Sequence, residues 1–382
     1  MTGSENKPKR TSQGGLILYH GMKLSTMVEL FRLKPSLRWS RWRQIALMPF
    51  FGAYNSVMAG VENLLFGRKI AKATIHPEPI FILGYWRSGT TLLHNLISED
   101  PRFSYPTLYE TVFPWHFLST EAINTRLTAW MVPKSRPMDN METHWHVPQE
   151  DEFAICCMCL ISPYTLPLRP FDLQEWTRSF RLHELSAKDR QRWKETITLF
   201  MKKLTVRQNK PLVMKSPSHT YRVKEILELF PQAKFIYISR NPFDVFNSTM
   251  HLRTTLIGEN TLGSPEHPGA EESIIETYLE AFRAYERDRP LIPAGNFSEI
   301  RYEDLVRTPL LEVGRIYEEL QLGNFDEARA RLELKLANHR EYKRNKFTPN
   351  AYWQNEVYRQ CREVYERFDY PAPESLDVAP LL

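Results

Sequence analysis

The sequence predicts an α/β fold in which helices flank a parallel β-sheet. Residues 79–84 (PIFILG) form a short apolar run that ends in glycine, as a buried parallel strand does. Residues 90–98 (TTLLHNLIS) follow with apolar side chains at helical spacing. The same order of strand, turn and helix recurs at residues 210–232 and again at residues 234–250. Strands that alternate with helices indicate a parallel sheet covered on both faces.

Local signals define the remaining elements. Residues 211–215 (PLVMK) read as the second strand, with a turn and a helix over residues 220–230 after it. Residues 235–239 (FIYIS) read as the third strand, and Asn241 and Pro242 are typical of the N-cap and first turn of the helix that follows. A fourth strand is predicted over residues 297–305. Further helices are predicted over residues 309–320 and 351–368.

The stretch ILGYWRSGTTLLHN, residues 82–95, has the frame of a phosphate-binding loop. Gly84 and Gly89 are separated by four residues, but Thr90 stands where the frame G-x-x-x-x-G-K-[ST] has lysine. In enzymes that hydrolyse nucleoside triphosphates, that lysine reaches the terminal phosphates. Its absence argues against an ATP-dependent reaction. Arg87 supplies a fixed positive charge instead, and the N-terminus of the next helix favours an anion.

Cationic side chains also follow the other strands. Lys215 ends the second strand, Arg240 leaves the third, and Ser248 lies about two turns into the next helix. Ligands of parallel sheets bind beyond the carboxyl ends of the strands. We therefore expect two separate anion sites at one edge of the sheet, which suits a nucleotide phosphorylated at two positions.

These motifs together resemble the sulfotransferases that use 3′-phosphoadenosine 5′-phosphosulfate (PAPS). GYWRSGTTLLHNLISEDPRF is similar to the 5′-phosphosulfate loop of that family, and FIYISRNPFDVFNS to its 3′-phosphate motif. VMKSPSH and IRYEDLVRTP are similar to its K-x-P and Y-E-D-L segments, as found in the tyrosylprotein and bacterial branches. The four motifs occur in the family's order. The resemblance implies a P-loop-type parallel sheet and sulfuryl transfer to a hydroxyl group, with adenosine 3′,5′-bisphosphate as the leaving group and no metal required.

The resemblance also assigns roles to residues. It implies that the loop residues bind the 5′ side of PAPS, that Lys215 contacts the reacting group, that Arg240 and Ser248 hold the 3′-phosphate, and that Tyr302 contacts the adenosine. The loop residues are Arg87, Ser88, Gly89, Thr90 and Thr91. Arg87 and Lys215 count among the catalytic candidates, because charge develops on the leaving oxygen.

Two residues compete for the role of the base that accepts the hydroxyl proton. Glu110 lies near the position of a catalytic glutamate in similar proteins, and His219 lies near that of a catalytic histidine. We favour Glu110. The acidic run Glu150, Asp151 and Glu152 is expected to be a solvated helix start, and orienting a polar substrate is the alternative.

The 382 residues are predicted to divide into an N-terminal basic, amphipathic helical extension (1–75), a catalytic domain (76–370) and a tail (371–382). Within the domain, residues 101–200 are rich in Trp, His, Pro and Met and are expected to form a helical, aromatic cap that shapes the acceptor pocket. The first dozen residues are expected to be disordered. The acceptor is predicted to be a small molecule, lipid or glycan.

Composition limits the partners and the compartment. The net charge of +5 suits small anions and does not call for nucleic acid. The four cysteines show no disulfide or metal pattern, which favours a reducing, cytoplasmic location. Residues 44–67 are interrupted by Pro49, Asn55 and Glu62, so no membrane-spanning helix is expected. Residues 1–67 could still contact a membrane surface, although an N-terminal helical pair packed on the domain is favoured. The oligomeric state is left open.

Two alternative functions remain at this point. A small-molecule kinase would need ATP and magnesium, and Thr90 in place of the lysine argues against it. A non-catalytic protein that binds anions at a membrane surface would explain the basic N-terminus.

Overall fold

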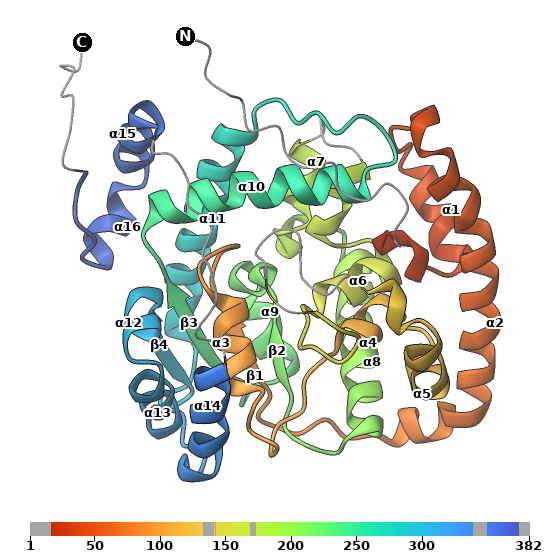
Figure 1. Cartoon of the computed structure of the whole chain (residues 1–382), viewed down its shortest axis with the longest axis horizontal. Helices are drawn as coiled ribbons and strands as arrows, with labels where there is room; N and C mark the ends of the chain where they lie inside the picture. The colour runs from red at the N-terminus through yellow and green to blue at the C-terminus, as the bar shows by residue number, and fades with distance from the viewer. Residues whose placement is uncertain (1–16, 133–140, 142, 169–172, 339–349, 374–382) are drawn as a thin grey trace.

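The computed structural model describes residues 17–132, 141, 143–168, 173–338 and 350–373 (Figure 1). The first dozen residues and most of the predicted tail lie outside these ranges.

Within the described part of the chain, four parallel strands form one sheet in the order β2-β1-β3-β4 (Figure 1). The strands are β1 (Ile80–Leu83), β2 (Val213–Lys215), β3 (Lys234–Ser239) and β4 (Phe297–Arg301). Ile82 of β1 is in register with Lys215 on one side and with Ile236 on the other. The predicted parallel α/β fold is confirmed. Because the strands run in one direction, the segments that follow them begin at a common edge.

Alternating side chains of the strands build two hydrophobic layers, one on each face of the sheet. Ile80 and Ile82 pack on one face with α3 (Thr90–Ile97), α13 (Pro309–Glu319) and α14 (Asp326–Asn338). Phe81 and Phe235 pack on the other face, where α8 (Ala187–Arg207), α9 (Val223–Leu229), α11 (Ala270–Asp288), α15 (Ala351–Gln360) and α16 (Arg362–Arg367) contribute. Both faces are therefore covered, as the continuous apolar strands require.

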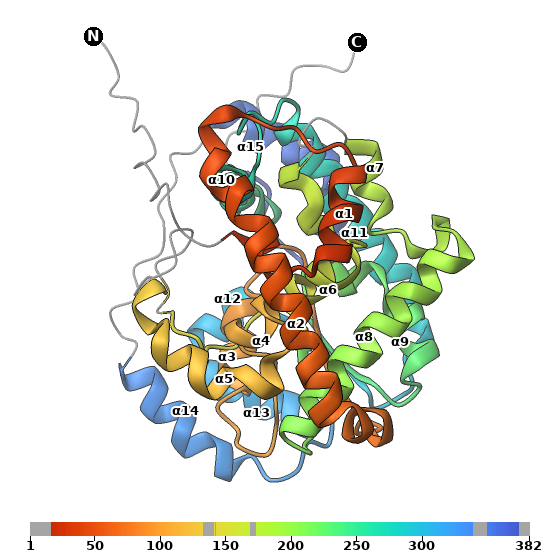
Figure 2. The same ribbon diagram turned by 90° about the vertical axis from the view of Figure 1, so that its right-hand side faces the viewer.

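The region between α3 and β2 is mainly helical. It contains α4 (Leu108–Val112), α5 (Phe117–Leu127), α6 (Glu152–Cys159), α7 (Leu173–Arg178) and α8 (Ala187–Arg207). The two N-terminal helices, α1 (Leu24–Arg32) and α2 (Trp42–Lys72), pack beside α5, α6 and α8 (Figure 2). No helix in the described ranges is long and apolar enough to cross a membrane.

Three predicted elements differ from the observed ones. The fourth strand ends at Arg301, because Tyr302 begins α12 (Tyr302–Arg307), whose first turn carries two acidic residues that complement the helix dipole. The helix expected from residue 220 begins at Val223, after a 3-10 turn over Pro217–Tyr221. The helix expected over residues 351–368 is divided at Cys361, although its apolar stripe is packed in the core as predicted.

Candidate active site

The loop between β1 and α3 depends on glycine at both ends. Gly84 and Gly89 have φ values of 143° and 108°, which strongly favour glycine. A Cβ atom on Gly89 would lie 2.3 Å from Cδ2 of Tyr302, so the loop can pack against this ring only because Gly89 has no side chain. Arg87 has a φ of 69°, a left-handed conformation that is unusual outside glycine and is found at functional sites.

The hydroxyl group of Ser88 lies close to Gly84, because a Cβ atom on Gly84 would be 2.6 Å from Ser88 Oγ. Its Oγ atom is buried and has no hydrogen-bond partner among the described residues. Buried hydroxyl groups are nearly always hydrogen-bonded, so an unpaired one inside a phosphate-type loop indicates a position for a ligand oxygen. The N-terminus of α3 begins two residues later, at Thr90, and adds a favourable dipole for an anion.

The predicted second anion site lies directly beside the loop. Arg87 Nε donates to Ser248 Oγ of α10 (Pro242–Asn260) at 2.8 Å. Arg240 Nη1 donates to the carbonyl oxygen of Arg87 at 3.0 Å, and the guanidinium carbon of Arg240 lies 4.5 Å from the centroid of the Tyr302 ring. The structure thus brings together Arg87, Arg240, Ser248 and Tyr302, which come from three different segments of the chain.

Lys215 contacts both the loop side of the site and the carboxylate of Glu150, which was not predicted to be a site residue. Its Nζ atom donates to Glu150 Oε1 at 2.8 Å and to Thr91 Oγ1 at 3.4 Å. The other oxygen of Glu150 accepts a hydrogen bond from the hydroxyl of Tyr164, and Trp86 Nε1 donates to the same hydroxyl at 3.2 Å. Burial and the adjacent Glu150 carboxylate raise the pKa of Tyr164 well above 10, so this hydroxyl remains a donor.

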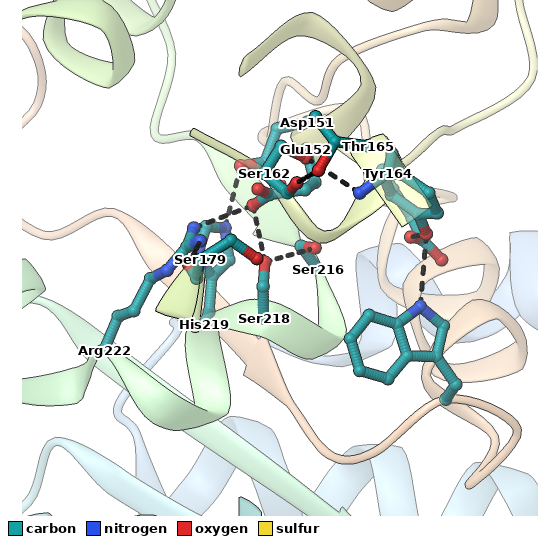
Figure 3. Close-up of polar contacts among 12 residues, drawn as sticks. Asp151, Glu152, Ser162, Tyr164, Thr165, Ser179, Ser216, Ser218, His219 and Arg222 are labelled. Carbon is teal, nitrogen blue, oxygen red and sulfur yellow. Dashed lines mark hydrogen bonds and ion pairs between the residues drawn. The ribbon is translucent and has the colours of Figure 1, made fainter. Parts of the chain in front are cut away.

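Glu150 is the first of three consecutive acids that pair with three basic residues, one at the end of β2 and two after it. Asp151 Oδ2 lies 2.7 Å from His219 Nε2, and Glu152 Oε2 lies 2.9 Å from Arg222 Nη1. Figure 3 shows the Asp151–His219 and Glu152–Arg222 contacts. It also shows the hydroxyl of Ser218, which donates to Glu152 and is hydrogen-bonded to the hydroxyl of Ser216. The expectation of a solvated helix start is therefore wrong. All three acids are buried, because each has a basic partner within the fold.

Both residues predicted to be the base are buried in structural contacts. Glu110 has no exposed surface and pairs with Arg207. It accepts a hydrogen bond from the backbone N–H of Thr107, the N-cap of α4, at 2.8 Å and thereby completes the capping box. Burial raises the pKa of Glu110, and the Arg207 charge opposes this shift. His219 also has no exposed surface and packs edge-on against Phe81 of β1, at 5.3 Å between ring centroids. In this structure neither side chain is open to an acceptor.

The signal that could have identified Glu150 is the spacing of the basic residues. Lys215, His219 and Arg222 are four and three residues apart, and three acids in a row offer one partner to each. No group of three or more potential metal-ligating side chains occurs among the residues that the structure describes.

The sequence model of the sulfotransferase family matches residues 79–327 of this chain. The chain belongs to the sulfotransferase family. An omega-hydroxy-beta-dihydromenaquinone-9 sulfotransferase from Mycobacterium tuberculosis is 35% identical over 99% of this chain and 98% of its own length. The counterpart of the same name from Mycobacterium bovis matches equally.

Solved sulfotransferases share the fold. The sulfotransferase STF9 from Mycobacterium avium has a TM-score of 0.63 at 19% identity and covers 82% of each chain. STF1 from Mycobacterium tuberculosis has a TM-score of 0.56 at 16% identity, with 83% of this chain and 87% of that one covered. This sulfotransferase is therefore an enzyme of sulfuryl transfer on a parallel α/β scaffold. The kinase alternative is not supported.

Proposed function

We propose that the chain transfers the sulfuryl group of PAPS to the hydroxyl group of a lipid-like alcohol. The observation that carries the proposal is the convergence of Arg87, Arg240 and Ser248 beside the loop after β1. A loop for the 5′-phosphosulfate and a neighbouring cationic site for a 3′-phosphate match a nucleotide phosphorylated at both positions.

The loop side of the site stabilises the leaving group. When the bond between sulfur and the 5′-phosphate oxygen breaks, negative charge develops on that oxygen. Arg87, the unpaired hydroxyl of Ser88 and the N-terminus of α3 are fixed donors around this position. Lys215, held at 3.4 Å from Thr91 Oγ1, adds a positive charge at the same edge of the sheet. This set of donors supports a reaction that does not require a metal ion.

Glu150 is our candidate for the base, ahead of Glu110 and His219. Its carboxylate accepts hydrogen bonds from Lys215 and from the hydroxyl of Tyr164, and that hydroxyl is in turn hydrogen-bonded to Trp86 of the loop. In the reaction, the acceptor oxygen forms a bond to sulfur, its proton passes to Glu150, and adenosine 3′,5′-bisphosphate leaves. A base must lie within hydrogen-bonding reach of the acceptor proton, and of the three candidates only Glu150 is linked to residues of the loop.

The acceptor class is inferred from the full-length relative. That enzyme is named for an omega-hydroxylated menaquinone, a lipid with a terminal hydroxyl group. Identity of 35% over 99% of the chain supports a hydroxylated isoprenoid lipid for this enzyme as well, ahead of a glycan. Trp86 of the loop and aromatic residues of the cap, such as Tyr164 and Trp176, are buried in the same region and suit an apolar substrate.

We also propose that the enzyme works in a reducing compartment, the cytoplasm. Its four cysteines are all free and buried, and burial raises the pKa of Cys159 to about 11, which keeps it a neutral thiol.

Calorimetry with adenosine 3′,5′-bisphosphate in metal-free buffer tests the nucleotide site. Wild type should bind, and Arg240→Ala should weaken binding by about 2 kcal/mol, as expected for loss of a hydrogen bond to a charged group. Arg329→Ala on α14, which removes an exposed arginine in a surface ion pair, is the matched control and should bind like wild type. Binding of ATP with magnesium in place of the bisphosphate would refute the proposal.

The acceptor is tested with radiolabelled PAPS. A hydroxylated menaquinone, the same quinone without the hydroxyl group, and an oligosaccharide should be compared. Label is expected only on the hydroxylated quinone. Label on the oligosaccharide alone would overturn the acceptor class and leave the sulfuryl transfer intact.

A further inference from the structure

Helix α2 buries three polar side chains between its charged ends, those of Gln44, Asn55 and Glu62. Between residues 44 and 67 the only charged residue is Glu62, and it is 1% exposed. Its carboxylate lies 2.7 Å from Lys203 Nζ of α8. Asn55 is fully buried and donates to the backbone carbonyl oxygens of His20 and Met22 at 2.7 and 2.9 Å. The polar groups of the helix are therefore used to attach it to the protein.

The outward face of α2 is apolar instead. A stripe of exposed apolar or aromatic side chains recurs every three or four residues, at Leu47, Phe50, Tyr54, Val57, Val61 and Leu64. Phe50 is 73% exposed and Leu64 is 85% exposed. At 1.5 Å per residue the stripe is about 25 Å long. Surface helices normally show the opposite arrangement, with the apolar face inward, so this stripe requires an explanation.

Neighbouring elements widen the stripe into a surface. Figure 2 shows α2 passing between α1 and α5, and the hydroxyl of Tyr54 accepts a hydrogen bond from Asn124 of α5 at 2.9 Å. Val28 of α1 is 52% exposed, and Leu127 of α5 is 68% exposed. Trp130, which follows α5, is 82% exposed.

Positive charges flank this surface at both ends of α2. Arg38 and Arg43 lie at its beginning, and Arg68, Lys69 and Lys72 lie at its end, all of them exposed. Along the exposed face between these two groups there is no charged residue of α2. Trp39 and Trp42, near the beginning of α2, are exposed like Trp130. An apolar centre bordered by basic residues and by exposed tryptophans is the pattern of a helix that lies in the headgroup region of a bilayer.

We propose that this surface binds an anionic phospholipid bilayer, with α2 lying parallel to the membrane plane. A spanning orientation would place Glu62 and Asn55 in the hydrocarbon, whereas these residues are attached to α8 and to the segment before α1. A second copy of the chain is a poorer partner. In a parallel or an antiparallel pair of α2 helices, a cationic end of one copy would face a cationic end of the other. The proposal does not depend on the identity of the acceptor.

Vesicle co-sedimentation of the full chain tests the proposal without donor or acceptor. Vesicles of phosphatidylcholine with phosphatidylglycerol should sediment wild type, and pure phosphatidylcholine vesicles should sediment less of it. The variant Phe50→Glu/Leu64→Glu should reduce the partition coefficient by about tenfold or more, since two exposed apolar anchors become charged. The control Leu311→Glu on α13, where the leucine is 68% exposed, should bind like wild type. Thermal unfolding should show that both variants fold.

A second variant, Arg68→Glu/Lys69→Glu, separates the charge contribution from the apolar one. It should lose binding to the anionic vesicles and retain the weak binding to pure phosphatidylcholine. Equal sedimentation of wild type and Phe50→Glu/Leu64→Glu would overturn the proposal. The proposal would also be overturned if wild type bound neither type of vesicle and formed a dimer, and if Phe50→Glu/Leu64→Glu were monomeric. The surface would then bind a second copy of the chain.

Discussion

Glu150–Lys215 and Glu152–Arg222 are ion pairs between the same two segments, yet their surroundings differ. Arg222 and Glu152 have no exposed side-chain surface. Arg222 Nη2 also donates to the carbonyl oxygen of Ser179 at 2.6 Å, and its guanidinium carbon lies 5.1 Å from the centroid of the Trp193 ring. The Glu150 side chain is 10% exposed, and its partners Lys215 and Tyr164 contact Thr91 and Trp86 of the phosphate-type loop.

Two ion pairs of the same chemical type can therefore have different roles in the protein. Glu152–Arg222 links α6 to the turn before α9 on the inside of the protein, where both side chains are fully buried. Glu150–Lys215 lies at the carboxyl edge of the sheet, where ligands of such folds bind. We therefore infer that the Glu152–Arg222 pair stabilises the fold and that the Glu150–Lys215 pair takes part in the reaction. Four predictions separate these roles, from the largest effect to the smallest.

Arg222→Ala should lower the free energy of unfolding by about 3–5 kcal/mol, because it leaves the buried Glu152 carboxylate without its cationic partner. Denaturant unfolding measures this. Arg329→Ala, at a surface pair, should change the free energy by less than about 1 kcal/mol. If Arg222→Ala were as stable as this control, the structural role of the Glu152–Arg222 pair would be refuted.

Glu150→Gln should lower kcat by about 10²- to 10⁴-fold, the usual contribution of a general base. It should also lower the free energy of unfolding, because the buried Lys215 loses its anionic partner, so kcat is to be measured where the variant is folded. Calorimetry should still detect binding of adenosine 3′,5′-bisphosphate to this variant, which would show that its nucleotide site is intact. Glu110→Gln is the comparison, since that carboxylate caps α4. A larger loss of kcat in Glu110→Gln than in Glu150→Gln would reverse our choice of base.

His219→Asn should destabilise the fold by about 1–3 kcal/mol, because Asp151 would lose a buried hydrogen-bond partner. The kcat of the remaining folded enzyme should stay close to that of wild type. Steady-state kinetics below the unfolding temperature would decide this point. Loss of kcat with unchanged stability would favour His219 as the base over Glu150.

Tyr164→Phe should lower kcat by about tenfold at most, since it removes a single hydrogen bond to Glu150 and keeps the ring in place. The affinity for adenosine 3′,5′-bisphosphate should not change. If kcat stayed at the wild-type value, the hydroxyl of Tyr164 would not orient the carboxylate.

The sequence alone determined the parallel sheet, the glycine-bounded loop and the placing of Arg87, Lys215 and Arg240 at strand ends. These features depend on local signals, namely apolar runs, a helix cap at Asn241 and glycine in a conformation that other residues avoid. Because all strands of a parallel sheet end at one edge, residues far apart in the chain could be placed together without the structure.

Our choice of Glu150 as the candidate base rests on the tertiary structure alone. Glu110 lies in the first turn of α4 and Glu150 just before α6. The sequence around each of them is equally compatible with a solvated carboxylate. Their environments are set by Arg207 and Lys215, which are distant in the chain. The inward polar face of α2 was decided in the same way, because Glu62 becomes buried only when Lys203 of α8 is packed against it. Burial of a charge depends on its partner, and sequence patterns do not fix that partner.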